Sequence, residues 1–145
     1  MITLIQRVSE ASVTVDGEIA GQIGRGILAL LAVQPDDAPA TVTRMVERVL
    51  TYRVFPDAEG RMNRSLADDS LELLVVPQFT LAADTKKGTR ASFTRAAPPE
   101  KANEYFDMFV KTCRDNLAVV ETGVFGADMK VALVNDGPVT FWLQA

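Results

Sequence analysis

Two stretches of the chain carry apolar residues at the spacing of an amphipathic helix. The first lies between Ala38 and Tyr52, and the second starts after Pro98-Pro99. This spacing places the apolar side chains on one face, which is then buried, and proline is typical of a first helical turn. We therefore predict two main helices. Their buried faces are Val42, Met45, Val46, Val49 and Leu50 in the first, and Ala102, Tyr105, Phe106, Phe109, Val110 and Cys113 in the second.

The other apolar segments are short, as expected for β-strands. Asp16-Gly17 predicts a tight hairpin turn, because both residues tolerate the positive φ angles that such a turn requires. Ile27–Val33 is apolar throughout, which is typical of a strand covered on both faces. The segment from Pro77 to Ala97 is predicted to be irregular. The predicted strands cover residues 2–8, 11–15, 18–23, 27–33, 53–55, 71–76, 129–134 and 139–143.

Length and composition fit one globular domain. The chain has 145 residues, of which 48% are hydrophobic and 23% are charged, values close to the globular average. No linker, repeat or low-complexity tract divides it. Two main helices among seven or eight strands predict a single α/β domain (mixed α+β) over residues 1–145, layered α/β/β, with largely antiparallel or mixed sheets.

The absence of histidine restricts the catalytic mechanisms and metal sites that the chain can form. It excludes His-based triads and nearly every zinc site. The one cysteine excludes an internal disulfide, and Cys113 is expected to be a core residue because it falls on an apolar helix face. The carboxylate pairs Asp57/Glu59 and Asp68/Asp69 lie in turn-like segments without calcium-loop spacing. No metal and no cofactor is therefore expected.

Charge and hydropathy restrict the classes of partner that this protein is expected to bind. The formal net charge of −4 disfavours a strongly basic nucleic-acid-binding protein but allows a local basic patch. No apolar run reaches the length of a membrane span, and the first residues carry no export signal. We expect a cytoplasmic protein without a membrane partner.

Gln78-Phe79-Thr80 directly follows a predicted buried strand. The end of a strand is a frequent place for ligand-binding groups. A threonine hydroxyl needs an adjacent base to become a nucleophile, and the sequence offers no obvious base. A positioning role for Thr80 is therefore favoured over covalent attack.

A short polar loop carries Lys86, Lys87 and Arg90, with Arg95 just beyond it. The loop is either simply solvated or a patch that contacts phosphates, and the sequence leaves both interpretations open. Phe93 lies in the same stretch, where it either stacks on a ligand or anchors the loop.

Gly137-Pro138 lies between two apolar strands. It is either a plain turn or a corner that projects into a pocket, and the sequence does not decide between a cis and a trans peptide bond. Because proline fixes φ, the carbonyl oxygens of such a corner are rigid. They can accept an ammonium group and exclude bulk on one side, which is a way to distinguish mirror-image ligands.

Two motifs together resemble the D-aminoacyl-tRNA deacylase family. They are Val76–Leu81 (VPQFTL) and Asn135–Thr140 (NDGPVT), and the resemblance continues over nearly the whole chain. It implies hydrolysis of the ester that joins a D-amino acid, or glycine mischarged on alanine tRNA, to the 3′ end of tRNA. This reaction is a proofreading step in translation. It also implies a homodimer with the active site at the subunit interface.

The resemblance assigns roles to individual residues. Gly137 and Pro138 match a cis Gly-Pro motif that enters the pocket of the other subunit and rejects L-amino acids, and Arg7 helps to hold it. The terminal ribose 2′-hydroxyl of the tRNA assists the reaction, and main-chain groups orient the substrate. The resemblance also implies Gln78, Phe79 and Thr80 in the pocket motif, Phe125 and Met129 near the terminal adenosine, and Ala102 on the pocket side. Pro77 is added as a substrate-binding candidate by its place in the motif, and Lys86, Lys87 and Arg90 as tRNA-binding candidates by their charge.

One position departs from the family pattern. The first motif usually begins with serine, whereas this chain has Pro77. An animal relative also has proline there, with another Gly-Pro geometry and a preference for removing an L-amino acid, but it carries a smaller residue where this chain keeps Phe79. The D-specific interpretation is favoured. The alternatives are a relaxed preference for a small L-amino acid and a non-catalytic nucleic-acid-binding domain of the same fold.

Overall fold

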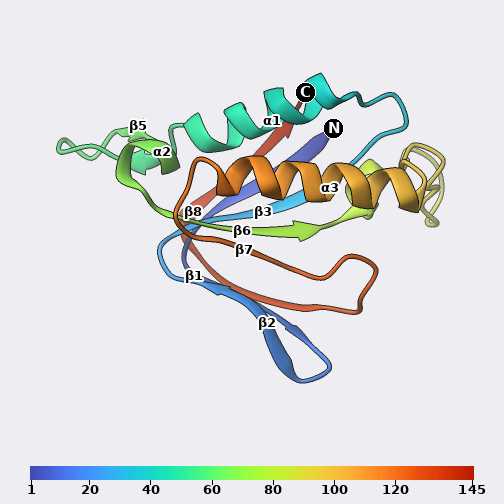
Figure 1. Ribbon diagram of the computed structural model, residues 1–145, viewed down its shortest axis with the longest axis horizontal. Helices are drawn as coiled ribbons and strands as arrows, with labels where there is room; N and C mark the ends of the chain where they lie inside the picture. The colour runs from blue at the N-terminus through green and yellow to red at the C-terminus, as the bar shows by residue number, and fades with distance from the viewer.

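The computed structural model describes residues 1–145 as one mixed α/β domain, in which helices cover one face of a six-stranded sheet (Figure 1). The strands are β1 (Ile2–Val15), β2 (Glu18–Ile23), β3 (Gly26–Ala32), β4 (Phe55–Pro56), β5 (Met62–Arg64), β6 (Glu72–Pro77), β7 (Val120–Thr122) and β8 (Lys130–Gln144). The helices are α1 (Pro39–Thr51), α2 (Leu66–Asp69), the 3₁₀ turn η1 (Phe79–Ala82) and α3 (Pro99–Arg114).

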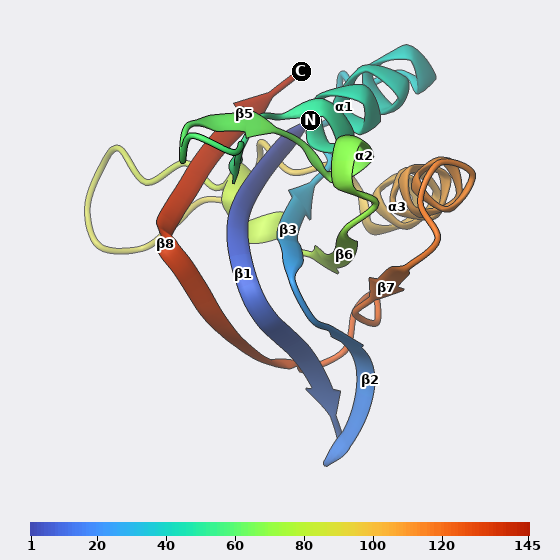
Figure 2. The same ribbon diagram turned by 90° about the vertical axis from the view of Figure 1, so that its left-hand side faces the viewer.

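The long strand β1 organises the sheet. Its first half pairs with β3 and its second half with β2, while β8 runs antiparallel beside most of its length (Figure 2). β3, β6 and β7 continue the sheet in parallel pairing, so the sheet is mixed, as predicted. β4 and β5 form a separate two-stranded hairpin.

The main core lies between the sheet and the helices α1 and α3. It contains 25 buried residues, including Ile27, Ala29 and Leu31 of β3. Leu28 of the same strand belongs to a second cluster of seven residues on the other face. The predictions of two amphipathic helices and of a central strand covered on both faces are therefore confirmed, with bounds that differ by one or two residues.

The second β layer comes from the curl of the same sheet. The second half of β1 turns with β2 over the far face of β3 and β6, and the seven-residue cluster fills the space between them. Gly21 of β2 comes so close to β7 that an ideal Cβ on it would lie 2.7 Å from the carbonyl oxygen of Thr122. Only glycine allows this approach, so the curl depends on that position.

Two predicted interruptions of strands are wrong. Residues 2–8 and 11–15 form one strand, β1, and the predicted strands 129–134 and 139–143 belong, apart from Met129, to one strand, β8, with Gly137-Pro138 inside it. The reason is that β1 and β8 pair along nearly their whole length, and register shifts at Gln6/Val8 and Val8/Glu10 absorb the irregular residues. Pairing between distant segments thus overrides the local turn signals.

The helix α2 was not predicted. Ser65 caps it: the Ser65 Oγ accepts a hydrogen bond from the Asp68 N–H (3.3 Å), and the Asp68 carboxylate accepts from the Ser65 N–H (2.9 Å). This is a capping box with aspartate in place of the usual glutamate or glutamine. The signal was therefore present in the sequence.

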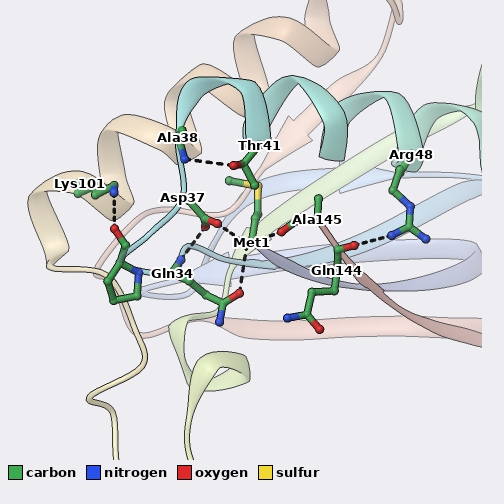
Figure 3. Close-up of polar contacts among 10 residues, drawn as sticks. Met1, Gln34, Asp37, Ala38, Thr41, Arg48, Lys101, Gln144 and Ala145 are labelled. Atoms are coloured by element: carbon green, nitrogen blue, oxygen red, sulfur yellow. Dashed lines mark hydrogen bonds and ion pairs between the residues drawn. The ribbon is translucent and has the colours of Figure 1, made fainter.

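The two ends of the chain meet beside α1 in a cluster of polar contacts, which we call the chain-end cluster: Met1, Gln34, Asp37 and Ala145 (Figure 3). The buried Met1 ammonium donates to Asp37 Oδ1 (2.5 Å), to the Ala145 carbonyl (3.0 Å) and to Gln34 Oε1 (3.1 Å). Asp37 Oδ2 accepts from the Gln34 N–H (2.7 Å). The cluster fixes the end of β3, where the candidate site begins.

The helices also answer the question of a membrane span. None of them has both the length and the apolar character that a membrane-crossing helix needs.

Candidate active site

An apolar cavity of about 740 Å³ lies beside the chain-end cluster. The ends of β3 and β6 contribute Leu31–Val33 and Val76–Phe79, α3 contributes Ala102 and Phe106, and the segment around Phe125 closes another side. Fourteen of its 20 lining residues are hydrophobic. A concave, mainly apolar site of this size with a few polar groups is typical of small-ligand binding.

The cavity brings together predicted site residues from distant parts of the sequence. Pro77, Gln78, Phe79, Ala102, Phe125 and Met129 all line it. The parallel pairing of β3 and β6 sets Leu31 opposite Pro77, so the motif after β6 starts at the cavity wall. The other predicted site residues lie outside the lining: Thr80, Arg7, Gly137, Pro138, Lys86, Lys87 and Arg90.

Gln78-Phe79-Thr80 forms the step from β6 into η1. The Gln78 N–H donates to the Leu31 carbonyl (2.8 Å), which fixes the backbone of the motif to β3. The Gln78 side-chain amide donates to the Thr80 hydroxyl, so that hydroxyl oxygen faces an amide rather than a base. Phe79 is 54% exposed at the cavity rim. The arrangement suits a positioning role for Thr80 and offers no route to an activated threonine nucleophile.

The opposite wall is fixed by aromatic and sulfur contacts. The Phe125 and Phe106 rings lie 6.4 Å apart in a tilted arrangement. Met129 Sδ accepts a hydrogen bond from the Val124 N–H (3.3 Å), and an ideal Cβ on Gly123 would lie only 2.7 Å from that sulfur. Gly123 therefore leaves the space that Met129 occupies beside the cavity.

Gly137-Pro138 is an exposed, braced corner of β8, and its peptide bond is cis. Arg7 Nε donates to the Asp136 carbonyl (2.8 Å), and Arg7 Nη1 donates to the Val54 carbonyl (2.6 Å). The Asn135 side chain accepts from the Val139 N–H (2.8 Å). Hydrogen bonds therefore hold the corner from both sides. Within one chain it does not reach the cavity.

Lys86, Lys87 and Arg90 lie on a loop that we call the basic loop, residues 84–92. Backbone hydrogen bonds between Asp84 and Ser92 (2.8 and 3.0 Å) close its base. The three cationic side chains are exposed, and none of them forms an ion pair. They lie beyond the cavity, but the chain that follows them returns to its rim at Phe93.

The perturbed ionisable groups lie outside the cavity. Burial raises the pKa of the Cys113 thiol to about 12, so this cysteine is a core residue, as predicted. The Asn63 side chain and the Arg61 and Glu59 N–H groups lower the pKa of Asp57, and Ser65 lowers that of Asp68. Asp57 accepts its hydrogen bonds in the turn between β4 and β5, as predicted. The interpretation of Asp68 and Asp69 as turn residues is wrong, because the capping box with Ser65 places both in the helix α2.

Sequence reasoning missed one part of the cavity. Phe106 was placed only in the helix core, but it also lines the cavity, as do Ala96 and Ala97. The periodicity that marks a helix face as buried does not tell whether it is covered by protein or by a ligand. No local signal separates the two.

The fold and the site together define a small mixed α/β domain with an apolar ligand cavity and no activated side-chain nucleophile in it. The family model described as D-Tyr-tRNA(Tyr) deacylase matches residues 4–144, and the chain belongs to this family.

Full-length relatives carry a consistent name. A D-aminoacyl-tRNA deacylase from Stenotrophomonas maltophilia (strain K279a) is 61% identical, with 99% of each chain covered. The protein of the same name from Vibrio cholerae serotype O1 (strain M66-2) is 59% identical over 100% of both chains. That from Escherichia coli O9:H4 (strain HS) is 56% identical over 99% of both.

Solved structures agree with the fold. The structure named c-Myc DNA Unwinding Element Binding Protein superimposes with a TM-score of 0.95 at 39% identity and covers 100% of this chain and 99% of its own. A probable eukaryotic D-amino acid tRNA deacylase superimposes with a TM-score of 0.88, covering 98% of this chain and 97% of its own. At 17% identity, the second likeness supports the fold alone.

Proposed function

We propose that this protein hydrolyses the ester between a D-amino acid, or glycine mischarged on alanine tRNA, and the 3′ end of tRNA. The names of its full-length relatives state the deacylase activity. The observation that carries the proposal is the cavity, which brings Gln78 and Phe79 of the first motif together with Phe125 and Met129, the residues expected near the terminal adenosine. The protein would act as a proofreading enzyme of translation in the cytoplasm.

The chemistry proposed for the site relies on position rather than on an activated side chain. An aminoacyl ester is already reactive, and the 2′-hydroxyl of the terminal ribose assists the attack of water. The first hydrogen bond of η1 is donated by the Leu81 N–H to the Gln78 carbonyl (3.2 Å). The N–H groups of Phe79 and Thr80 come before this bond, so they have no acceptor within η1 itself. We assign to these two groups the orientation of the ester, with Gln78 and Thr80 fixing the turn.

The proposed selection between mirror images requires a second copy of the chain. Gly137-Pro138 is rigid and exposed but lies outside the cavity of its own chain. It would enter the cavity of a partner subunit and collide with the side chain of an L-amino acid. Glycine, without a side chain, would pass. The edge strand β8 also leaves Val131, Val134 and Trp142 exposed, which supports a homodimer along this edge.

The test is the release of amino acid from D-tyrosyl-tRNA and from L-tyrosyl-tRNA at equal enzyme concentration. We expect rapid release of D-tyrosine and slow release of L-tyrosine. Equal rates, or no release of D-tyrosine, would contradict the proposal. The same assay with L-alanyl-tRNA tests the effect of Pro77 on specificity. Rapid release of L-alanine would indicate the relaxed preference for a small L-amino acid.

A second candidate is a nucleic-acid-binding domain without turnover. One relative at 39% identity is named for binding a DNA unwinding element, and the unpaired cations of the basic loop could contact phosphates. The formal charge of −4 weakens this candidate, since non-specific affinity grows with the number of phosphates neutralised. Tight binding of a duplex or RNA stem with no loss of amino acid from D-tyrosyl-tRNA would favour it.

A further inference from the structure

Phe79 and Phe93 form an exposed aromatic pair at the cavity rim, which we call the rim pair. Their ring centroids are 5.2 Å apart and the rings are tilted by 60°. Phe79 is 54% exposed and Phe93 is 46% exposed, yet both line the cavity. Two neighbouring phenylalanines left half in solvent gain less from burial than core residues do. Such an exposed apolar surface at a ligand cavity indicates a binding role.

Phe93 is held at this position by the backbone on both sides. Before it, Ser92 is paired with Asp84 by two backbone hydrogen bonds. After it, the Ala96 N–H donates to the Phe93 carbonyl (3.1 Å), and the Ala97 N–H donates to the Val33 carbonyl of the cavity wall (2.9 Å). The backbone that carries the Phe93 ring is therefore fixed, and the ring contacts Phe79 although it is exposed. A preorganised aromatic surface loses little entropy when it binds a ligand.

The rim pair flanks the basic loop in the sequence: Phe79 lies before the loop, and Phe93 directly follows it. Phe93 and Thr94 line the cavity, whereas Lys86, Lys87 and Arg90 lie beyond it and have no anionic partner. Aromatic rings together with unpaired cations on an adjoining loop are typical of proteins that bind single-stranded nucleic acid: bases stack on the rings, and the cations contact phosphates.

From this arrangement we infer that Phe93, supported by Phe79, stacks on the base of the nucleotide that precedes the terminal adenosine, while the strand leaves the cavity across the basic loop. The inference rests on the proposed function, which places the terminal adenosine deeper, near Phe125 and Met129. Those two residues are less exposed than the rim pair. The base of the preceding nucleotide lies further from the ester than the terminal adenine, so it would contact the rim pair rather than the deeper residues.

The test compares three substrates that carry the same D-tyrosyl ester: adenosine alone, the dinucleotide cytidylyl-adenosine, and the whole tRNA. The wild-type protein should have a lower KM for the dinucleotide than for adenosine, because only the dinucleotide supplies a base to Phe93. Stacking of one base predicts a KM increase of about 5- to 150-fold for the dinucleotide and the tRNA in Phe93→Ala. The KM for adenosine should change far less, and Phe93→Tyr should restore the wild-type values.

Ile19→Ala is the matched control, because Ile19 is a large apolar residue that is 61% exposed on β2, away from the cavity lining. It should leave all three KM values unchanged. If Phe93→Ala raised the KM of the adenosine ester as much as that of the dinucleotide, Phe93 would only support the pocket and the inference would be wrong. If the wild-type protein hydrolysed the adenosine ester and gained nothing from the added cytidine, it would also be wrong, although the proposed function would stand. Hydrolysis of none of the three substrates would instead contradict the proposed function.

The path across the basic loop has its own readout. Lys86→Gln combined with Lys87→Gln should reduce the salt dependence of kcat/KM for tRNA by about one unit of slope per cation. The KM gain from the dinucleotide should persist in this variant, because the rim pair is unchanged. Arg61→Gln, at the β4–β5 hairpin on the opposite end of the molecule, removes one exposed cation and is the control for the single variant Lys86→Gln; it should leave the slope unchanged (Figure 1). An unchanged slope in the double variant would overturn the assigned path.

Discussion

Val33 and Gln34 are neighbours in sequence but belong to regions with opposite character. Val33 lines the cavity, where Phe79 and Phe93 stay half exposed at the rim. Gln34 belongs to the chain-end cluster, where the Met1 ammonium has three acceptors and is buried. In the cluster the polar groups satisfy one another, which contributes to stability. At the cavity, apolar surface is left uncovered, and this is the surface that a ligand can bury.

The largest effect should come from Asp37→Asn in the chain-end cluster. The change leaves the buried Met1 ammonium without its carboxylate, and breaking a buried ion pair costs about 3–5 kcal/mol. Urea denaturation measures the loss. Asp36→Asn, at the exposed neighbouring position, is the control and should cost less than about 0.5 kcal/mol. Equal stability of the two variants would remove the distinction between the two regions.

Gly137→Ala should act on activity more than on stability. Gly137 has a φ of +147°, and an ideal Cβ would lie 2.7 Å from Val139 Cγ2 and 3.2 Å from Arg7 Nη2. The added methyl group displaces the braced corner, and a displacement near 1 Å lowers the rate about 100-fold. Release of D-tyrosine from tRNA measures the effect, with circular dichroism as the check on folding. A folded variant with wild-type turnover would show that the corner plays no part in the reaction.

Cys113 provides a pH-dependent test of the main core, to which its buried side chain belongs. Its folded pKa is raised to about 12, above the ordinary value of 9.0, so the fold holds the neutral thiol. Below pH 9 the Cys113 thiol is protonated in both the folded and the unfolded state, so it does not change the free energy of unfolding. Above pH 9 only the unfolded state releases it, and stability should fall by up to about 1.4 kcal/mol per pH unit from this group. Urea denaturation between pH 8 and 10.5 should show this additional fall in the wild type and not in Cys113→Ala.

Thr80→Ala should have the smallest effect. It removes a hydrogen bond with Gln78 at an exposed position, worth about 0.5–1.5 kcal/mol, so turnover of D-tyrosyl-tRNA should drop by less than about tenfold. The measurement is kcat under saturating substrate. Complete loss of turnover in a folded variant would mean that Thr80 takes part in bond making.

The sequence by itself determined the elements whose signal is local. The buried faces of α1 and α3, the turn at Asp16-Gly17 and the bounds of β2 all follow from neighbouring residues, because periodicity and turn chemistry act over a few positions. It also supplied the two motifs from which the family was inferred.

Only the tertiary structure decided which of these residues share a site. Parallel pairing of β3 with β6 sets Leu31 against Pro77, and the packing of α3 brings Phe106 to the same cavity. Because the pairing with β1 is long, two predicted strands are joined in the single strand β8. Gly137-Pro138 therefore lies within β8 and outside the cavity of its own chain. The physical reason is that a cavity is made by contacts between segments far apart in sequence, and no local pattern encodes where those segments meet.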